Sequence, residues 1–305
     1  MIEKIVVALR RAAIVILKNL WLFAFGFAYT LAAPVFFLGG TGLPILFWAA
    51  SGRYFEPGLL WRDPLSFLLS HWQLILFSMA GCFVGFTLYL VVVLFYHGAL
   101  TGSVARAAPA EGLGALSIPG ATFFQEGRKN FTGSLATATL ASLLPLFPGI
   151  ILFGLGLLFL LKLPSLLTLG ELNASPALVV LGLAALGFGL LSVIIGWLAF
   201  LWYRYALCAL CVESLPAGRA MRRALDFFAE RWPLVLGLVV ASLVLGVICW
   251  MLTAPLGFLT RFAEDISQPL ALALRVLIIP LSLVLGVFME LWFKAALVVL
   301  YIENR

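Results

Sequence analysis

Charged residues are scarce in this sequence: Asp, Glu, Lys and Arg make up 10% of its 305 residues, whereas apolar residues make up 64%. A soluble domain has about 25% charged and roughly 45–50% apolar residues. Even a large soluble domain keeps a polar exterior, because folding never removes the whole surface from water. The shortage of charge therefore excludes an ordinary soluble fold and predicts that lipid surrounds most of the chain.

The residues that carry most catalytic and metal chemistry are also few. Two histidines and four cysteines are present, without the clusters that predict a zinc site. Cys208 and Cys211 have the spacing of a redox motif, but they lie in an apolar stretch where packing is the simpler interpretation. Glu56, Asp63 and His71 share one expected outer loop, and their spacing defines no site. We therefore expect no enzymatic activity, no cofactor and no metal.

Six apolar stretches are long enough to cross a bilayer. A helix rises 1.5 Å per residue, so about 20 apolar residues cross a hydrocarbon core of about 30 Å. The sequence thus predicts an all-α, polytopic membrane protein with a single transmembrane domain over residues 1–305. The six predicted spans are 20–40, 74–97, 131–161, 177–203, 233–257 and 269–300.

The basic residues are distributed unequally between the two sets of span ends. Fourteen of the 19 lie at one set of ends, namely Lys4, Arg10, Arg11, Lys18, Arg106, Arg128, Lys129, Arg204, Arg219, Arg222, Arg223, Arg231, Lys294 and Arg305. The opposite ends carry five, namely Arg53, Arg62, Lys162, Arg261 and Arg275. Because short cytoplasmic loops are enriched in Lys and Arg, both termini are predicted to be cytoplasmic. The basic residues are too dispersed to predict a nucleic-acid partner.

The three returning spans end with a similar pattern. Residues 202–213 align without a gap on residues 292–303. In both segments a basic residue follows two aromatic residues, and a glutamate follows nine residues later. Residues 95–100 form a weaker copy, with Arg106 at the position of the acid. This similarity predicts an internal threefold repeat.

A basic stretch precedes each odd-numbered span. In residues 217–231, apolar side chains recur at helical spacing on one face and charged side chains lie on the other. Residues 2–19 and 123–130 are predicted to behave in the same way. The fold is therefore predicted to be three repeated hairpins, each preceded by a cytoplasmic amphipathic helix. The repeats cover about 1–107, 117–213 and 217–305.

The segment between the second and third hairpins is similar to a known family. It reads Val212-Glu213-Ser214-Leu215-Pro216-Ala217-Gly218-Arg219-Ala220-Met221-Arg222-Arg223-Ala224-Leu225 and continues through Glu230-Arg231-Trp232. It resembles six-span bacterial membrane proteins related to the membrane domain attached to some glycerophosphoryl diester phosphodiesterases. The resemblance implies a six-helix fold in a bacterial inner membrane. It implies no phosphodiesterase activity, because this sequence holds no soluble barrel domain with acidic metal ligands.

Glycine and proline predict a helix end in the first span and close helix packing in the fourth. The run 39–44, Gly-Gly-Thr-Gly-Leu-Pro, is expected to end the first span, with residues 45–50 as a short re-entrant or interfacial piece. In the fourth span, glycines are expected to permit close helix packing. These glycines are Gly182, Gly187, Gly189 and Gly196.

A few ionisable residues in the spans are the candidate site. Glu290 and Lys294 lie one helical turn apart in the orientation that favours an ion pair. In the repeat alignment, His97, Arg204 and Lys294 lie at equivalent depths, where they could converge on an anionic group such as a lipid phosphate. The alternative is that all three are independent anchors at the interface, with Lys294 paired to Glu290.

Two functions fit these patterns. The first is non-enzymatic handling or translocation of lipids or lipid-like amphiphiles, including anionic membrane lipids, as the proline-containing spans and the repeats suggest. The second is a membrane scaffold or assembly partner. In that case the basic cytoplasmic helices would dock a soluble protein or complex.

Overall fold

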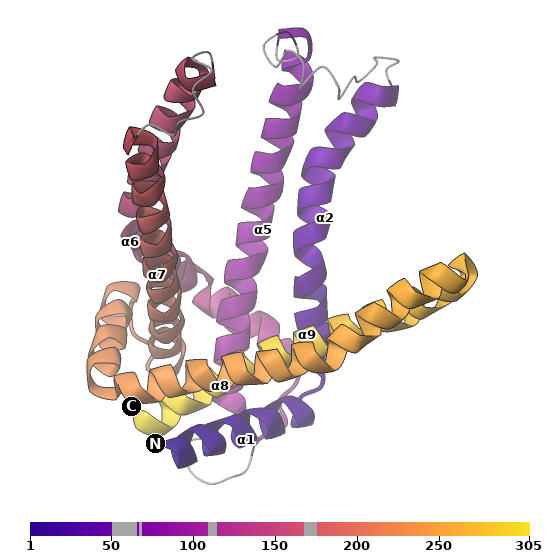
Figure 1. Ribbon diagram of the computed structural model, residues 1–305. Helices are drawn as coiled ribbons and strands as arrows, with labels where there is room; N and C mark the ends of the chain where they lie inside the picture. The colour runs from indigo at the N-terminus through magenta and orange to yellow at the C-terminus, as the bar shows by residue number, and fades with distance from the viewer. Residues whose placement is uncertain (51–65, 67–68, 109–114, 168–175) are drawn as a thin grey trace. The chain divides into compact units, whose positions relative to one another are not determined.

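The computed structural model describes residues 1–50, 66, 69–108, 115–167 and 176–305. Its long elements are all α-helices, and the described residues contain no β-strand (Figure 1). The helices are α1 (Ile2–Lys18), α2 (Trp21–Ala50), α5 (Trp72–Ala107), α6 (Ala121–Leu167), α7 (Pro176–Val212), α8 (Ala217–Ile266) and α9 (Gln268–Asn304).

Six of these helices are long and apolar enough to cross a membrane. They are α2, α5, α6, α7, α8 and α9. Each contains one of the six predicted stretches, except that α2 begins at Trp21, one residue after the predicted start. Large apolar side chains on their surfaces face outward, and Phe83, Phe147 and Phe153 are more than two-thirds exposed. Helices satisfy their own backbone hydrogen bonds, which hydrocarbon requires. The prediction of an all-α protein with six such helices is confirmed.

The described chain forms two compact units. The first comprises Met1–Lys129 and Pro233–Glu303, and the second comprises Asn130–Trp232 with Asn304–Arg305. The first unit contains α1, α2, α5, the beginning of α6, the part of α8 after its kink, and α9 as far as Glu303. Within this unit α2 and α5 run side by side (Figure 1). The second unit contains α6 from Asn130 on, all of α7 and the beginning of α8.

The short helix α1 packs through one apolar face. Its buried side chains recur every three or four residues, as at Ala8, Ala12 and Val15. Asn19 ends the helix and is only 1% exposed. Its amide nitrogen donates to the carbonyl oxygens of Val15 (2.9 Å) and Leu116 (3.0 Å), and its side-chain oxygen accepts the Ile118 N–H. This buried amide therefore holds the α1–α2 junction against the segment before α6.

The helix α8 is interrupted at Arg231, where the backbone leaves helical geometry (φ −124°, ψ 19°). Pro233 follows two residues later and has no N–H to donate to the preceding turn. The interruption coincides with the boundary drawn from the sequence between the basic stretch 217–231 and the span 233–257.

The glycine and proline run at residues 39–44 does not end the first span, which corrects the expectation from sequence. α2 continues through it to Ala50. A Cβ atom at Gly81 of α5 would lie 2.1 Å from the Gly40 carbonyl oxygen, and one at Gly85 would lie 2.5 Å from that of Phe36. Pro44 cannot donate to the Gly40 carbonyl, which lies against Gly81 instead. The glycines thus allow α2 and α5 to approach closely.

The glycines of the fourth span have no close neighbour among the described residues. No described atom lies within 4 Å of a Cβ built at Gly182, Gly187, Gly189 or Gly196. That these glycines permit close helix packing therefore stays a prediction. Helix spacing depends on what faces a glycine, which its own position in the sequence does not reveal.

Replacing Gly81 with Leu should separate α2 from α5 and lower the stability of the fold. Overpacking a close contact costs about 1–3 kcal/mol, and here the obstacle is backbone. The matched control is Gly39→Leu in α2, because a Cβ at Gly39 meets no atom within 4 Å. Thermal unfolding of the purified protein in detergent measures the difference. Equal melting temperatures for the two variants would contradict the close packing.

Candidate functional site

Glu290 and Lys294 form an ion pair on α9. The Lys294 ammonium donates to Oε1 of Glu290 one turn earlier in the helix. The Lys294 side chain is 8% exposed, whereas that of Glu290 is 37% exposed. The predicted pair is therefore present, with the cation enclosed by protein and the carboxylate reaching the surface. An uncompensated charge among apolar helices is costly, so each member of the pair stabilises the other.

Two tyrosines missed by the sequence analysis enclose the ammonium group. Tyr29 of α2 and Tyr96 of α5 stack with their ring centroids 4.1 Å apart. Lys294 Nζ lies 4.8 Å and 4.7 Å from these centroids. Such similar distances place Nζ beside the stacked rings rather than over a single face. Cation–π attraction is strongest over a face, at about 0.5–2 kcal/mol, so Glu290 is the main partner of the ammonium.

His97 lies against the same pair of tyrosines. It is 5% exposed, and its ring centroid lies 5.8 Å from those of both Tyr29 and Tyr96. The structure thus brings together His97 and Lys294, two members of the predicted basic trio, on one aromatic pair. Both belong to the first compact unit.

Arg204 belongs to the second compact unit. It lies on α7, is 7% exposed, and its guanidinium carbon lies 4.8 Å from the ring centroid of Phe200. The convergence of all three basic residues on one anionic group stays a prediction.

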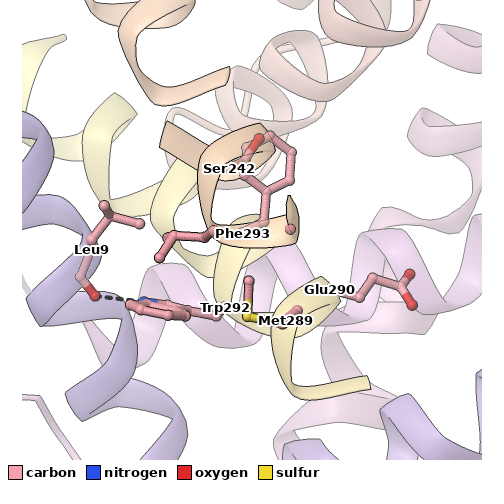
Figure 2. A pocket seen from close by; sticks show the side chains of 8 residues that line it. Leu9, Ser242, Met289, Glu290, Trp292 and Phe293 are labelled. Carbon is pink, nitrogen blue, oxygen red and sulfur yellow. Dashed lines mark hydrogen bonds between the residues drawn. The ribbon is translucent and has the colours of Figure 1, made fainter. Parts of the chain in front are cut away.

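A pocket of about 240 Å³ lies beside Glu290 in the first unit. Its walls come from α1, α8 and α9 (Figure 2). Two polar groups of the wall make internal hydrogen bonds: the Trp292 indole N–H donates to the Leu9 carbonyl (2.7 Å), and the Ser242 hydroxyl donates to the Val239 carbonyl (2.7 Å). The lining residues are Leu9, Ser242, Leu245, Gly246, Met289, Glu290, Trp292 and Phe293.

The glutamates nine residues after Arg204 and Lys294 pair with residues of other helices. A separation of nine residues places the two side chains on opposite sides of a helix. Glu303 of α9 accepts from Arg11 of α1 at 2.6 Å, and Glu213 lies 3.5 Å from Arg223 of α8.

Two more ion pairs lie in the first unit. Arg275 of α9 pairs with Glu264 of α8. Arg106 pairs with Glu126 of α6 at 2.6 Å, and this pair was missed. Its signal was the position of Arg106, nine residues after His97 in the repeat alignment.

The other polar candidates form no cluster where the structure describes them. Among described residues, no group of three His, Cys, Asp or Glu side chains is placed to hold a metal ion. Cys208 is buried, Cys211 is partly exposed and both are free thiols. His71 is buried with Nδ1 2.8 Å from the Ser70 hydroxyl, while Glu56 and Asp63 lie outside the described residues.

The geometry defines a helical, multi-pass membrane protein with an ion pair and an apolar pocket on its membrane-crossing helices. The chain matches no protein-family model and no curated protein sequence. Its resemblance to the membrane domain associated with phosphodiesterases therefore stays a prediction.

Replacing Lys294 with Met should destabilise the protein by about 2 kcal/mol. Removing one partner of a buried ion pair costs about 3–5 kcal/mol, and partial exposure of Glu290 reduces this cost. The double variant Glu290→Gln, Lys294→Met removes both charges and should recover most of the loss. Chemical unfolding in detergent measures both midpoints. A single variant as stable as the wild type would show that the pair is not structurally important.

Proposed function

We propose that the chain is a multi-pass protein of a bacterial inner membrane that binds and translocates lipid-like amphiphiles without catalysis. The observation that carries this proposal is the Glu290–Lys294 ion pair beside an apolar pocket on a membrane-crossing helix. Ionisable residues in such helices are rare because hydrocarbon penalises charge, and they commonly mark a functional path. An apolar wall with a polar group at its edge suits a molecule that is itself part apolar and part polar.

Recurring contacts support the proposed threefold repeat. Trp202, two residues before Arg204, donates from its indole N–H to the Met221 carbonyl at 2.8 Å. Trp292, two residues before Lys294, makes the corresponding bond to Leu9. Met221 and Leu9 each lie ten residues before the end of their basic stretch, at 231 and 19. Two returning helices thus contact two basic helices in the same register.

Two of the ion pairs follow the same register. Glu213 and Glu303 occupy equivalent positions in the alignment, and their partners Arg223 and Arg11 each lie eight residues before the end of a basic stretch. In the remaining copy the charges are exchanged, because Arg106 takes the position of the acid. Its partner Glu126 lies four residues before the end of the stretch 123–130, one helical turn from the equivalent position. We infer that each returning helix docks onto the basic helix of the next repeat, and the third onto the first.

On this proposal the basic helices lie at one membrane surface, and the excess of Lys and Arg supports a cytoplasmic location for that surface. Both termini are then cytoplasmic, and the ion pair on α9 lies near the cytoplasmic leaflet. An amphiphile entering from that leaflet would meet the polar group first, with its chain against the apolar helix surfaces. Anionic lipid head groups would be attracted to the same surface by the excess of Lys and Arg.

The beginning of α8 favours a second function, a scaffold that docks a soluble protein. Ala220, Met221 and Ala224 are buried there, whereas Arg219 and Arg222 are exposed. A basic face of this kind suits an acidic partner surface. Purification in mild detergent with identification of bound chains tests this function, and protein recovered with lipid alone would count against it.

Translocation is tested with the protein reconstituted in vesicles that contain fluorescently labelled phospholipids. The triple variant His97→Ala, Arg204→Ala, Lys294→Ala should slow lipid movement at least about tenfold, as expected when a charge-assisted contact of about 1.5–3 kcal/mol is lost. Arg275→Ala is the matched control, because Arg275 forms an exposed ion pair outside the proposed site. Equal rates for wild type and triple variant would exclude the basic residues from the path, and no movement above protein-free vesicles would exclude translocation.

A further inference from the structure

The pocket beside Glu290 has a chemistry that selects among amphiphiles. We propose that it binds one alkyl chain whose polar head is an ammonium group, with the Glu290 carboxylate as the recognition group. This inference rests on the proposed function, because it names the class of amphiphile that enters the same region of the protein.

The polar side chains of the pocket offer hydrogen-bond acceptors. A carboxylate such as that of Glu290 is an acceptor only. The Ser242 hydroxyl and the Trp292 indole N–H donate to backbone carbonyls inside the wall. Ser242 keeps oxygen lone pairs, whereas the indole has no further proton to donate. A phosphate or carboxylate head needs donors, so the pocket disfavours an anion and suits a donor.

The unequal burial of the ion pair points to the same head group. Glu290 lines the pocket with a side chain that is 37% exposed, whereas the Lys294 side chain is 8% exposed and lies beside Tyr29 and Tyr96. Lys294 thus contacts Glu290 from the protein side, and the accessible part of the pair is the carboxylate. An ammonium head group in the pocket would contact the exposed side of the Glu290 carboxylate, opposite the side that Lys294 contacts.

The size of the pocket limits the ligand to a single chain. Its volume of about 240 Å³ is below the roughly 300–1,000 Å³ of ordinary small-molecule sites. The remaining walls are apolar, with Leu9, Met289 and Phe293 around the space (Figure 2). Leu245 also lines the pocket. Such a site accommodates a head group and the first part of one chain.

Gly246 is an exposed residue of the pocket wall. A Cβ built at Gly246 meets no atom within 4 Å, so a large side chain fits at this position without displacing backbone. Because Gly246 lines the pocket, we expect such a side chain to obstruct the space.

The experiment compares three probes of equal chain length: dodecylammonium, dodecanol and dodecanoate. Each is titrated into the protein in phosphatidylcholine nanodiscs, with tryptophan fluorescence, to which the pocket residue Trp292 contributes, and thermal stability as readouts. We expect dodecylammonium to bind at least about tenfold more tightly than dodecanoate. Empty nanodiscs correct for partition into lipid.

Two variants locate the binding. Gly246→Phe should abolish saturable binding of dodecylammonium. The matched control is Gly286→Phe on the exposed surface of α9, which should leave binding intact. A Cβ at Gly286 also meets no atom within 4 Å, but Gly286 does not line the pocket. Glu290→Gln should reduce the affinity for dodecylammonium about tenfold and leave that for dodecanol unchanged. If Gly246→Phe does not fold, Glu290→Gln alone decides the assignment.

Tighter binding of dodecanoate than of dodecylammonium would overturn the head-group assignment, and so would saturable binding of neither probe. Dodecylammonium binding unaffected by Gly246→Phe or by Glu290→Gln would overturn the location. These results are separable from those on translocation. Vesicles without lipid movement, together with intact dodecylammonium binding, would reject the proposed transport and retain the site.

Discussion

The cost of charge in hydrocarbon is the constraint on which the rest of this structure depends. Apolar side chains cover the long helices, so each ionised group on them needs a partner, a polar backbone group or access to the interface. Lys294 has Glu290, Arg11 has Glu303 and both partners lie on α9. The few charges are therefore informative, because each one reports a place where helices meet or where the membrane surface lies.

This constraint also connects the architecture to the proposed function. A helix that only needs to cross a bilayer would gain nothing from a glutamate, and an apolar residue at position 290 would carry no desolvation cost. The pair instead supplies an enclosed cation and an accessible carboxylate beside the pocket. Transport of an amphiphile requires such a surface, since the moving molecule must be matched at its polar end and along its chain.

Features that depend on local composition could be predicted from the sequence. Features that depend on which element packs against a segment could not. Hydropathy located the six long helices, because hydrocarbon thickness sets their length. In contrast, the run ending at Pro44 was misread as a break, because the packing against Gly81 that favours a continuous helix comes from α5. Tyr29 and Tyr96 were missed for the same reason, since nothing local distinguishes them from other aromatic residues.

The most direct test of the account is the sidedness of the chain in a bacterial inner membrane. A fluorescent protein that matures only in the cytoplasm and a phosphatase active only in the periplasm are fused in turn to each end. We expect fluorescence and no phosphatase activity at both ends, because cytoplasmic termini place fourteen of the 19 basic residues on the cytoplasmic side. Active phosphatase at both ends would contradict it and would place the ion pair of α9 at the opposite leaflet.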